Sequence, residues 1–388
     1  MIYKIKELMT VNRGSSPRPI IEYLSNSGFK WLKISDFNYR DKFVYNTKEY
    51  IKEIKNTKYV KAGTLILTNS ATPGIPIFLG KDMCLHDGFL YFTNIENKVN
   101  INYIFYWFQN YRDSILNLAN GSVFKNLKKE IVENLEMDLP SMDIQNKVVY
   151  ILDTINNKIN LNSEINNNLY KFTNKLFQKL FEENEIREYK RLDEISDCQN
   201  GHAFYKEGYD EDGLMVIDLG NVNLNSNFIY TNADKFIDKS RIPNEKFIVK
   251  KDDLVMIMTD RKATMDLLGK TAKIYENKEY ALNQRIYRIR SKINVNYLYT
   301  YLNSDKVLQE LKSKALGSVQ KYINTNVINE IMIPLFEKKN MEEFSNVVNP
   351  IFKYMENNII ESKNLEQLRD TLLPKLMNGE IDLYNIEI

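Results

Sequence analysis

The strongest constraint on the fold of this chain of 388 residues is a pattern of apolar residues that occurs twice, 196 positions apart. The first copy lies between about residues 143 and 181, and its apolar residues alternate in steps of three and four, beginning at Leu152, Ile155 and Ile159. This spacing is typical of one face of a long helix that packs against a partner helix. The second copy lies between about residues 342 and 377. The sequence therefore predicts two long helices that pair with each other.

Polar residues interrupt both copies at the same relative place, Asn162 in the first and Asn358 in the second. Polar residues in such a seam lower stability but fix the register and the orientation of the partner. At about 1.5 Å per residue, about 38 helical residues span about 57 Å, so we interpret the pair as a spacer between two globular parts. The predicted seam residues are Leu152, Ile155, Ile159, Asn162, Leu169 and Leu176 in the first helix, and Val348, Ile351, Met355, Asn358, Leu365 and Leu372 in the second.

The segments before the two helices also resemble each other. Gly121-Ser-Val-Phe-Lys125 precedes the first helix and Gly317-Ser-Val-Gln-Lys321 precedes the second. Each half mixes short β-prone runs with helical segments, and the aromatic segment 100–119 is interpreted as a core helix. The predicted fold class is α+β, with two globular domains separated by two long antiparallel helices in a tandem pseudo-repeat. The predicted divisions are a domain at 1–140, a helix at 141–187, a domain at 188–335, and a helix with its tail at 336–388.

Composition narrows the class of protein. No apolar run approaches the roughly 18 residues of a membrane span, and the N-terminus has no long apolar signal core, which predicts a cytoplasmic protein. Two cysteines and two histidines form neither a disulfide framework nor a zinc cluster. The net charge is +2, but residues 1–140 carry 19 basic and 14 acidic side chains. This local excess is weak evidence for a polyanionic partner.

Motifs of DNA-modifying enzymes are present only as fragments. Leu268-Gly-Lys-Thr271 resembles the end of a phosphate-binding loop, but Thr264 stands where that loop needs a glycine. Asn349-Pro-Ile-Phe352 resembles the tetrapeptide with which amino-methyltransferases hold a target base, but it lacks the second proline. The sequence shows no glycine-rich turn for S-adenosylmethionine either. We therefore predict a non-catalytic chain that has no metal site and no cofactor of its own.

The loops of the two halves carry types of side chain that can recognise DNA. Arg, Asn and Gln reach base edges, while Lys, Ser and Thr contact phosphates. The frameworks of the halves agree and their loops differ, which indicates one scaffold that recognises two different things. The candidate DNA-binding residues are Arg13, Ser15, Ser16, Arg18, Ser70, Thr72 and Lys125 in the first half, and Gln199, His202, Tyr205, Lys206, Arg261, Lys262, Gln320 and Lys321 in the second.

This organisation resembles the specificity subunit of type I restriction-modification systems, and the resemblance covers nearly the whole chain. One departure is Phe336-Glu-Lys-Lys-Asn340, which replaces the usual Pro-rich, Gln-containing entry to the second helix. The stretches that carry the resemblance are the two Gly-Ser segments, Leu139-Pro-Ser-Met-Asp-Ile-Gln145, Asp253-Leu-Val-Met-Ile-Met-Thr259, Leu282-Asn-Gln-Arg285 and Leu372-Leu-Pro-Lys-Leu-Met-Asn-Gly-Glu-Ile381.

The resemblance implies two target-recognition domains that each read one half of a split sequence in double-stranded DNA. It also implies that the helices act as a ruler and dock two methyltransferase subunits, which methylate adenine. S-adenosylmethionine, and ATP with Mg²⁺ for restriction, are then expected in partner subunits. Restriction and translocase subunits are further partners that the resemblance allows. The alternative is a stand-alone DNA-binding regulator, or a coiled-coil adaptor, without a methyltransferase partner.

Overall fold

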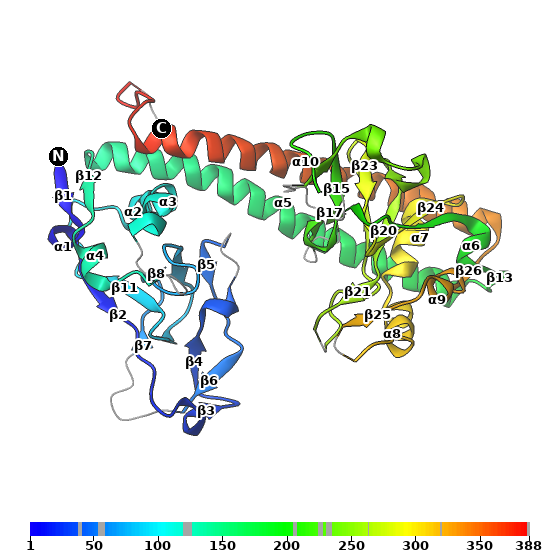
Figure 1. Cartoon of the computed structure of the whole chain (residues 1–388), viewed down its shortest axis with the longest axis horizontal. Coiled ribbons are helices and arrows are strands. Elements are labelled where there is room, and N and C mark those ends of the chain that lie inside the picture. Colours follow the sequence, from blue (N-terminus) through cyan, green and yellow to red (C-terminus); the bar gives the residue numbers. More distant parts are fainter. Residues whose placement is uncertain are drawn as a thin grey trace. The chain divides into compact units, whose positions relative to one another are not determined.

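The computed structural model describes residues 1–37, 41–52, 59–118, 126–204, 208–223, 228–229, 235–262, 264–318 and 320–385. Its chain forms two compact units, drawn in Figure 1. Unit 1 comprises Met1–Lys158 and Asn364–Ile388, and unit 2 comprises Ile159–Lys363. Within the described part of the chain, we find no helix that is both long and apolar enough to span a membrane.

Unit 1 contains two five-stranded sheets with the strand orders β3-β6-β4-β10-β7 and β2-β11-β8-β9-β5, and β1 pairs with β12. The runs of apolar and β-branched residues form the inner strands, so that every residue of β8 and β9 is buried. In chain order the helices and strands are β1 Ile2–Lys4, α1 Ile5–Leu8, β2 Thr10–Arg13, β3 Leu24–Ser25, β4 Phe29–Leu32, β5 Phe43–Val44, β6 Glu49–Ile51, β7 Tyr59–Val60, β8 Leu65–Thr68, β9 Pro76–Leu79, β10 Met83–Leu85, β11 Phe89–Thr93, α2 Ile101–Asn110, α3 Arg112–Leu118, α4 Lys129–Glu133 and β12 Glu136–Asp138.

The aromatic segment of unit 1 lies in the core, where Tyr103, Phe105 and Phe108 are each at most 2% exposed. The prediction of a single helix over residues 100–119 is wrong, because α2 and α3 are separate helices that meet at Tyr111. The ring of Tyr111 stacks on Trp107 with 4.8 Å between centroids, and its backbone ψ is 3° instead of a helical value. The Tyr111 N–H still donates to the Trp107 carbonyl at 2.9 Å and the Ile115 N–H to the Tyr111 carbonyl at 3.0 Å, so the break is a local change in backbone angle.

Unit 2 contains a six-stranded sheet in the order β14-β24-β20-β22-β17-β16 and a four-stranded sheet in the order β18-β15-β23-β19. The strand pairs β13-β26 and β21-β25 complete its described strands. The helices and strands are β13 Glu188–Arg191, α6 Leu192–Ile195, β14 Ser196–Asn200, β15 Leu214–Ile217, β16 Val222–Asn223, β17 Phe228–Ile229, β18 Phe236–Ile237, β19 Ile248–Val249, β20 Leu254–Ile257, β21 Thr259–Asp260, β22 Thr271–Lys273, β23 Tyr280–Leu282, β24 Ile286–Ser291, α7 Val295–Leu302, α8 Asp305–Ser313, β25 Lys321–Tyr322, α9 Thr325–Asn329 and β26 Met332–Leu335.

The two predicted long helices are confirmed as α5, Met142–Glu183, and α10, Lys338–Met377. Within unit 2 they run antiparallel, because Asn166 contacts Asn358 while Asn184, further along α5, contacts Asn340 near the start of α10. Of the predicted seam residues, Leu152, Ile155, Asn162, Val348, Met355 and Asn358 are buried, and Ile159, Leu169, Leu176, Ile351, Leu365 and Leu372 are half-buried.

In unit 1 a polar network fastens the globular part to the helices. The Asp153 carboxylate on α5 accepts hydrogen bonds of 2.5 Å from both Lys42 Nζ and the Tyr106 hydroxyl. Burial raises the pKa of Tyr106, so the hydroxyl stays protonated and can donate. The Tyr106 oxygen accepts from the Asn156 amide at 2.9 Å, and Asn156 in turn accepts from Arg369 of α10 at 3.1 Å.

In unit 2 a buried ion pair has the same role. Lys273, on β22, is buried, and its Nζ donates to Glu356 Oε1 of α10 at 2.7 Å and to Asn296 Oδ1 of α7 at 3.0 Å. Asp252 Oδ1 lies 3.1 Å from the same Nζ. A buried charge of this kind requires its partners, because an unpaired ion is poorly tolerated away from water. The globular part of each unit is thus held on the long helices by specific polar contacts.

Candidate nucleic-acid interface

The candidate interface of unit 1 lies at one end of the sheet that contains β2, β8 and β11. Arg13 is the last residue of β2, so the loop that carries Ser15, Ser16 and Arg18 starts at Gly14. The Gly14 N–H donates to the Phe89 carbonyl at 2.9 Å. A Cβ at Gly14 would lie 2.2 Å from the carbonyl oxygen of His86. Only glycine therefore allows the loop to approach this closely.

Asp87 connects the predicted DNA-binding residues at this end. Its Oδ1 accepts from Ser16 Oγ at 3.0 Å, and its backbone carbonyl accepts from Arg13 Nε and from the Asn69 amide, both at 3.1 Å. The Arg18 guanidinium lies 3.7 Å from Oδ2 and is 84% exposed. Asp87 was not predicted from the sequence, although Asp-Gly at positions 87 and 88 is a typical turn signal.

A cavity of about 650 Å³ opens beside Asp87. Arg18, Trp31, Lys33 and His86 contribute to its lining. The imidazole of His86 meets the Trp31 indole edge-on at 5.8 Å between ring centroids. Arg18 and His86 lie next to the Asp87 carboxylate, at 3.7 Å from Oδ2 and 3.0 Å from Oδ1. Charged, polar and aromatic groups in one cavity suit a ligand that is both aromatic and polar, such as a nucleotide base.

The other predicted residues of unit 1 follow β8. The Thr72 N–H donates to the Ser70 carbonyl at 2.7 Å, and Thr68 Oγ1 donates to the Thr72 carbonyl at 2.6 Å. Ala71, between them, adopts a positive φ of 57°. Thr72 is exposed in this tight loop and Ser70 is half-buried. Lys125 lies outside the described residues.

The candidate interface of unit 2 lies at the end of β14, after Gln199 and Asn200. The Gly201 N–H donates to the Ile286 carbonyl at 3.2 Å, and a Cβ at Gly201 would lie 1.9 Å from the Asn283 carbonyl oxygen. The loop is again held close by a glycine. His202 packs its ring against two aromatic rings, at 5.0 Å from Phe204 and 5.2 Å from Phe247. Tyr205 and Lys206 lie outside the described residues.

The pairing of β21 with β25 brings two predicted sets together. Asp260 is opposite Lys321 in this pair, so Arg261 and Lys262 follow directly beside it, and Gln320 precedes Lys321. Asp260 is 2% exposed, and its carboxylate accepts from the Lys262 N–H at 2.8 Å, which fixes the turn. Arg261 and Lys262 are exposed. Three basic side chains are thereby gathered at one place.

The two sheet ends are built from the same backbone contacts. A β-turn, here called the first turn (residues 86–89), is closed by a 3.1 Å bond from the Phe89 N–H to the His86 carbonyl. The second turn (residues 283–286) is closed by a 3.0 Å bond from the Ile286 N–H to the Asn283 carbonyl. Three N–H to carbonyl bonds around the first turn each have a counterpart around the second. The bond from Gly14 to Phe89 matches that from Gly201 to Ile286, and the bond from Ser15 to Leu85 matches that from His202 to Leu282. The bond from Asn69 to Gly88 matches that from Met258 to Arg285.

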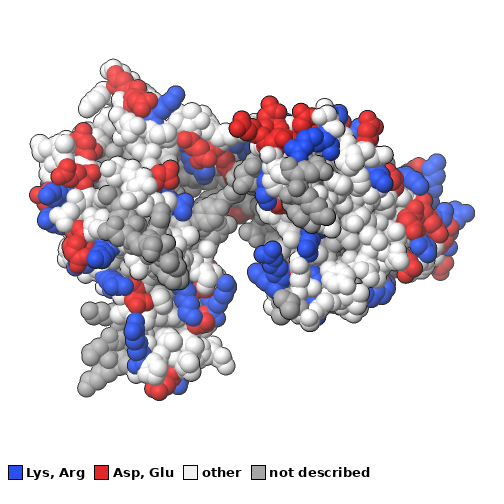
Figure 2. All heavy atoms as spheres, viewed as in Figure 1, with Lys and Arg blue, Asp and Glu red and all other residues white. Residues whose placement is uncertain are grey.

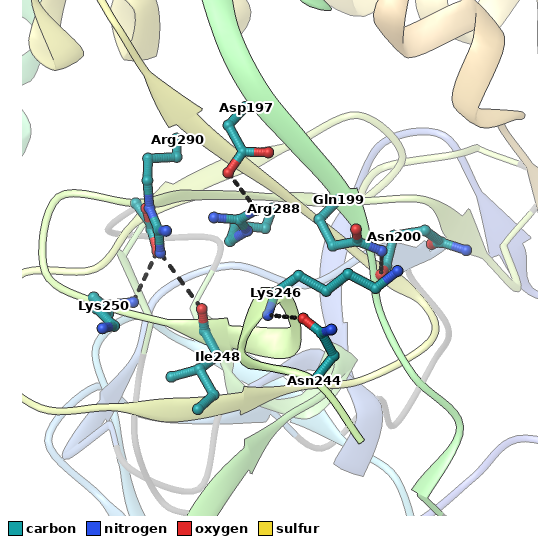
Figure 3. Close-up of polar contacts among 10 residues, drawn as sticks. Asp197, Gln199, Asn200, Asn244, Lys246, Ile248, Lys250, Arg288 and Arg290 are labelled. Carbon is teal, nitrogen blue, oxygen red and sulfur yellow. Dashed lines mark hydrogen bonds and ion pairs between the residues drawn. The ribbon is translucent and has the colours of Figure 1, made fainter. Parts of the chain in front are cut away.

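Figure 3 shows a polar cluster along β14 and β24 in unit 2. Arg288 is 1% exposed and donates to Asp197 at 2.8 Å. Arg290 donates to Asp253 through Nε at 2.7 Å and Nη2 at 2.8 Å, and this bond raises the pKa of its guanidinium. Both arginines are thus paired and brace the sheet. Lys246 is exposed beside them and is a candidate for phosphate contact that the sequence prediction missed.

Charge is mixed on the face of both units that is visible in Figure 2. Figure 2 shows Lys and Arg interspersed with Asp and Glu on the visible face. Attraction to a polyanion must therefore come from local groups, such as the three basic residues beside β21 and β25. Among the described residues, no three His, Cys, Asp or Glu side chains are placed to hold a metal ion. Burial raises the pKa of the Cys84 thiol to about 11 and that of Cys198 to about 12, so both are protonated at neutral pH.

Comparison with protein families gives one match that occurs twice. The model described as type I restriction modification DNA specificity domain matches residues 1–171 and again residues 184–367. The two matches together cover most of the chain and fall on its two similar halves.

Individual proteins give the same result. The specificity subunit of the type I restriction enzyme MjaVIII of Methanocaldococcus jannaschii is 24% identical over 378 residues, which covers 89% of this chain and 87% of that protein. The MjaIX specificity subunit of the same organism is 24% identical, with 98% of this chain and 93% of that protein covered. A solved S subunit of a type I restriction-modification system from M. genitalium superposes with a TM-score of 0.56 at 15% identity, covering 97% of this chain and 95% of that chain, which shows a shared fold.

Proposed function

We propose, because this chain belongs to the family of type I restriction-modification DNA specificity domains, that its two sheet ends are the surfaces with which a specificity subunit reads DNA. Each end then reads one half of a bipartite, non-palindromic sequence in double-stranded DNA. Recognition is assigned to residues 1–140 and 188–335, and residues 141–187 and 336–388 serve as the spacer. The protein acts in the cytoplasm.

The observation that carries this proposal is the repeated frame around the first and second turns. The backbone contacts of the two frames match, while the side chains on them differ. Ser15 has the place of His202, and Asn69 has the place of Met258. A rigid scaffold that presents different side chains at equivalent positions is what the reading of two different half-sites requires.

Catalysis is assigned to partners. In this proposal two methyltransferase subunits dock on the long helices, bind S-adenosylmethionine and methylate adenine at the site that this chain selects. Restriction subunits that use ATP and Mg²⁺ complete the complex. No residue of this chain is given a catalytic role. Its own contribution is to hold the DNA in register with the partner subunits.

The experiment is a reconstitution with purified adenine methyltransferase subunits of a type I system from the same cell. Methylated positions on genomic DNA are mapped by sequencing, with and without this chain. We expect methylation at one bipartite sequence only when both components are present, and no methyl transfer or cleavage by the chain alone. Methyl transfer by the purified chain alone, or methylation by the mixture without sequence preference, would contradict the proposal.

The alternative is a stand-alone DNA-binding regulator or a coiled-coil adaptor. A regulator that reads a palindrome normally uses two identical modules, whereas the two frames here carry different side chains. Affinity purification of the chain from its own cell separates the two cases. Co-purification of a methyltransferase subunit supports the specificity subunit.

A further inference from the structure

The two central positions of each turn are equivalent in the two units. They are Asp87 and Gly88 in the first turn, and Gln284 and Arg285 in the second. Each turn joins two buried strand segments. The central residues of the first turn lie where the loop after Gly14 meets the loop after β8, and those of the second turn lie where the loop after Gly201 meets the loop after β20. Asp87 and Gln284 therefore occupy the same place at the centre of each sheet end.

Within the part of the chain that the structure describes, Asp87 Oδ2 accepts no hydrogen bond. Oδ1 accepts from Ser16 at 3.0 Å and lies 3.0 Å from His86 Nδ1, whereas the nearest guanidinium nitrogen of Arg18 lies 3.7 Å from Oδ2, beyond a hydrogen bond. The Asp87 side chain is 31% exposed and contributes to the lining of the 650 Å³ cavity. A carboxylate is repelled by phosphates, so beside DNA a contact with a base amino group, which donates to it, is more favourable than a contact with the backbone.

Gln284 is held in a comparable way. Its backbone N–H donates to Asn283 Oδ1 at 2.8 Å, which fixes the turn, and its side chain is exposed. Within the part of the chain that the structure describes, the side-chain amide of Gln284 has no hydrogen-bond partner. A Gln amide offers one donor and one acceptor, the pair that matches N7 and N6 of adenine.

We propose that Asp87 and Gln284 are specificity-determining residues at equivalent positions of the two half-sites. Asp87 accepts a hydrogen bond from the N4 amino group of a cytosine in one half-site. Gln284 forms a bidentate pair with an adenine in the other. The inference rests on the proposed function, because it identifies the chemistry by which each sheet end selects one base pair.

The test exchanges carboxylate and amide without changing shape. In Asp87→Asn, an amide nitrogen in place of Oδ2 donates instead of accepting, so it no longer pairs with the amino group of cytosine. In Gln284→Glu, the new carboxylate matches cytosine. The complete chain with its methyltransferase subunits is used, and methylated sequences are mapped. Asp82→Asn is the control in unit 1, because Asp82 is bound to Lys61 and to the Ala62 N–H away from the turn.

The expected result is a change at one base pair of one half-site in each variant. In Gln284→Glu, preference for adenine should fall roughly 5- to 160-fold, the equivalent of one bidentate contact, and should move towards cytosine. In Asp87→Asn, preference for cytosine should fall, because the one atom that accepts from its amino group is lost. The control variants are Asp82→Asn in unit 1 and Gln309→Ala, on the exposed face of α8, in unit 2. Both should methylate the same DNA sequence as the wild-type chain.

The contradicting outcomes are distinct. If both isosteric variants methylate the same DNA sequence as the wild-type chain, Asp87 and Gln284 do not read bases. If Asp87→Asn lowers methylation of all sites equally, the carboxylate only braces the loop through Ser16. If the wild-type chain itself directs no methylation to a bipartite sequence, the proposed function fails, and this result is independent of the two variants.

Discussion

The side-chain amide of Asn358 donates a hydrogen bond of 2.9 Å to the side-chain oxygen of Asn166, and both residues are buried between the two long helices of unit 2. The amide of Asn166 donates in turn to the Met355 carbonyl at 3.1 Å. A second contact lies close by, since Asn162 donates to Ser362 Oγ at 3.2 Å and to Glu361 Oε2 at 2.8 Å. These polar residues hydrogen-bond across the two helices and so define one register, although the buried Asn162 Oδ1 has no partner among the described residues.

A single replacement in this pair should be costly. Asn358→Leu leaves the buried Asn166 oxygen without its donor and should lower the free energy of unfolding by about 1–3 kcal/mol. The double variant Asn166→Leu/Asn358→Leu removes both polar groups and should recover much of that loss. Urea unfolding of the three proteins measures both effects. A single variant as stable as the wild type would show that this hydrogen bond contributes nothing.

Breaking the ion pair between Lys273 and Glu356 should also lower the free energy of unfolding, by more than breaking the asparagine pair. Lys273→Met leaves the Glu356 carboxylate, which is 4% exposed, without its principal partner. The free energy of unfolding should fall by about 3–5 kcal/mol. Lys278→Met, which removes a lysine that is 66% exposed, is the matched control and should change it by less than about 1 kcal/mol. Equal effects of the two replacements would mean that the buried contact does not hold the sheet on α10.

The basic residues beside β21 should act on one half-site only. Replacing Arg261 and Lys262 by Ala removes two exposed cations from unit 2 and leaves the frame of unit 1 unchanged. Recognition of one half-site should weaken or relax by about 1–3 kcal/mol if a bidentate base contact is lost. Mapping of methylated sites gives the readout, with Lys338→Ala/Lys339→Ala at the exposed start of α10 as the control. A loss of base preference at both half-sites together would contradict the claim that the two units read DNA independently.

The long helices could be predicted because their signal is local. A seam such as Leu152 to Ile159 repeats within a few residues, and the helical period alone determines which residues share a face. The observed helices begin and end within four residues of the predicted limits, which frayed helix ends readily account for.

Asp87 and its contacts could not be predicted in the same way. Ser16 is 71 positions away in sequence and reaches Asp87 only through the pairing of β2 with β11. Strand pairing across such distances depends on tertiary packing and leaves no local period. Two local signals were present that the prediction did not use. They are Asp-Gly at positions 87 and 88, and the basic residues Arg288 and Arg290 at alternate positions of β24.

The central claim is that two separate units read two half-sites at a distance set by the paired helices, and helix length tests it most directly. Seven residues inserted in each helix, near Asn162 and Asn358, keep the seam in register and lengthen the pair by about 10 Å. At about 3.4 Å per base pair, the unread spacer should grow by up to roughly three pairs.

Two residues inserted at the same places should rotate the seam off its partner and abolish function. The decisive measurement is the sequence of the sites methylated by the seven-residue variant together with its methyltransferase subunits. We predict both half-sites unchanged and a longer spacer between them. An unchanged spacer would contradict the account, because the helices would then only dock partners while flexible joints set the distance.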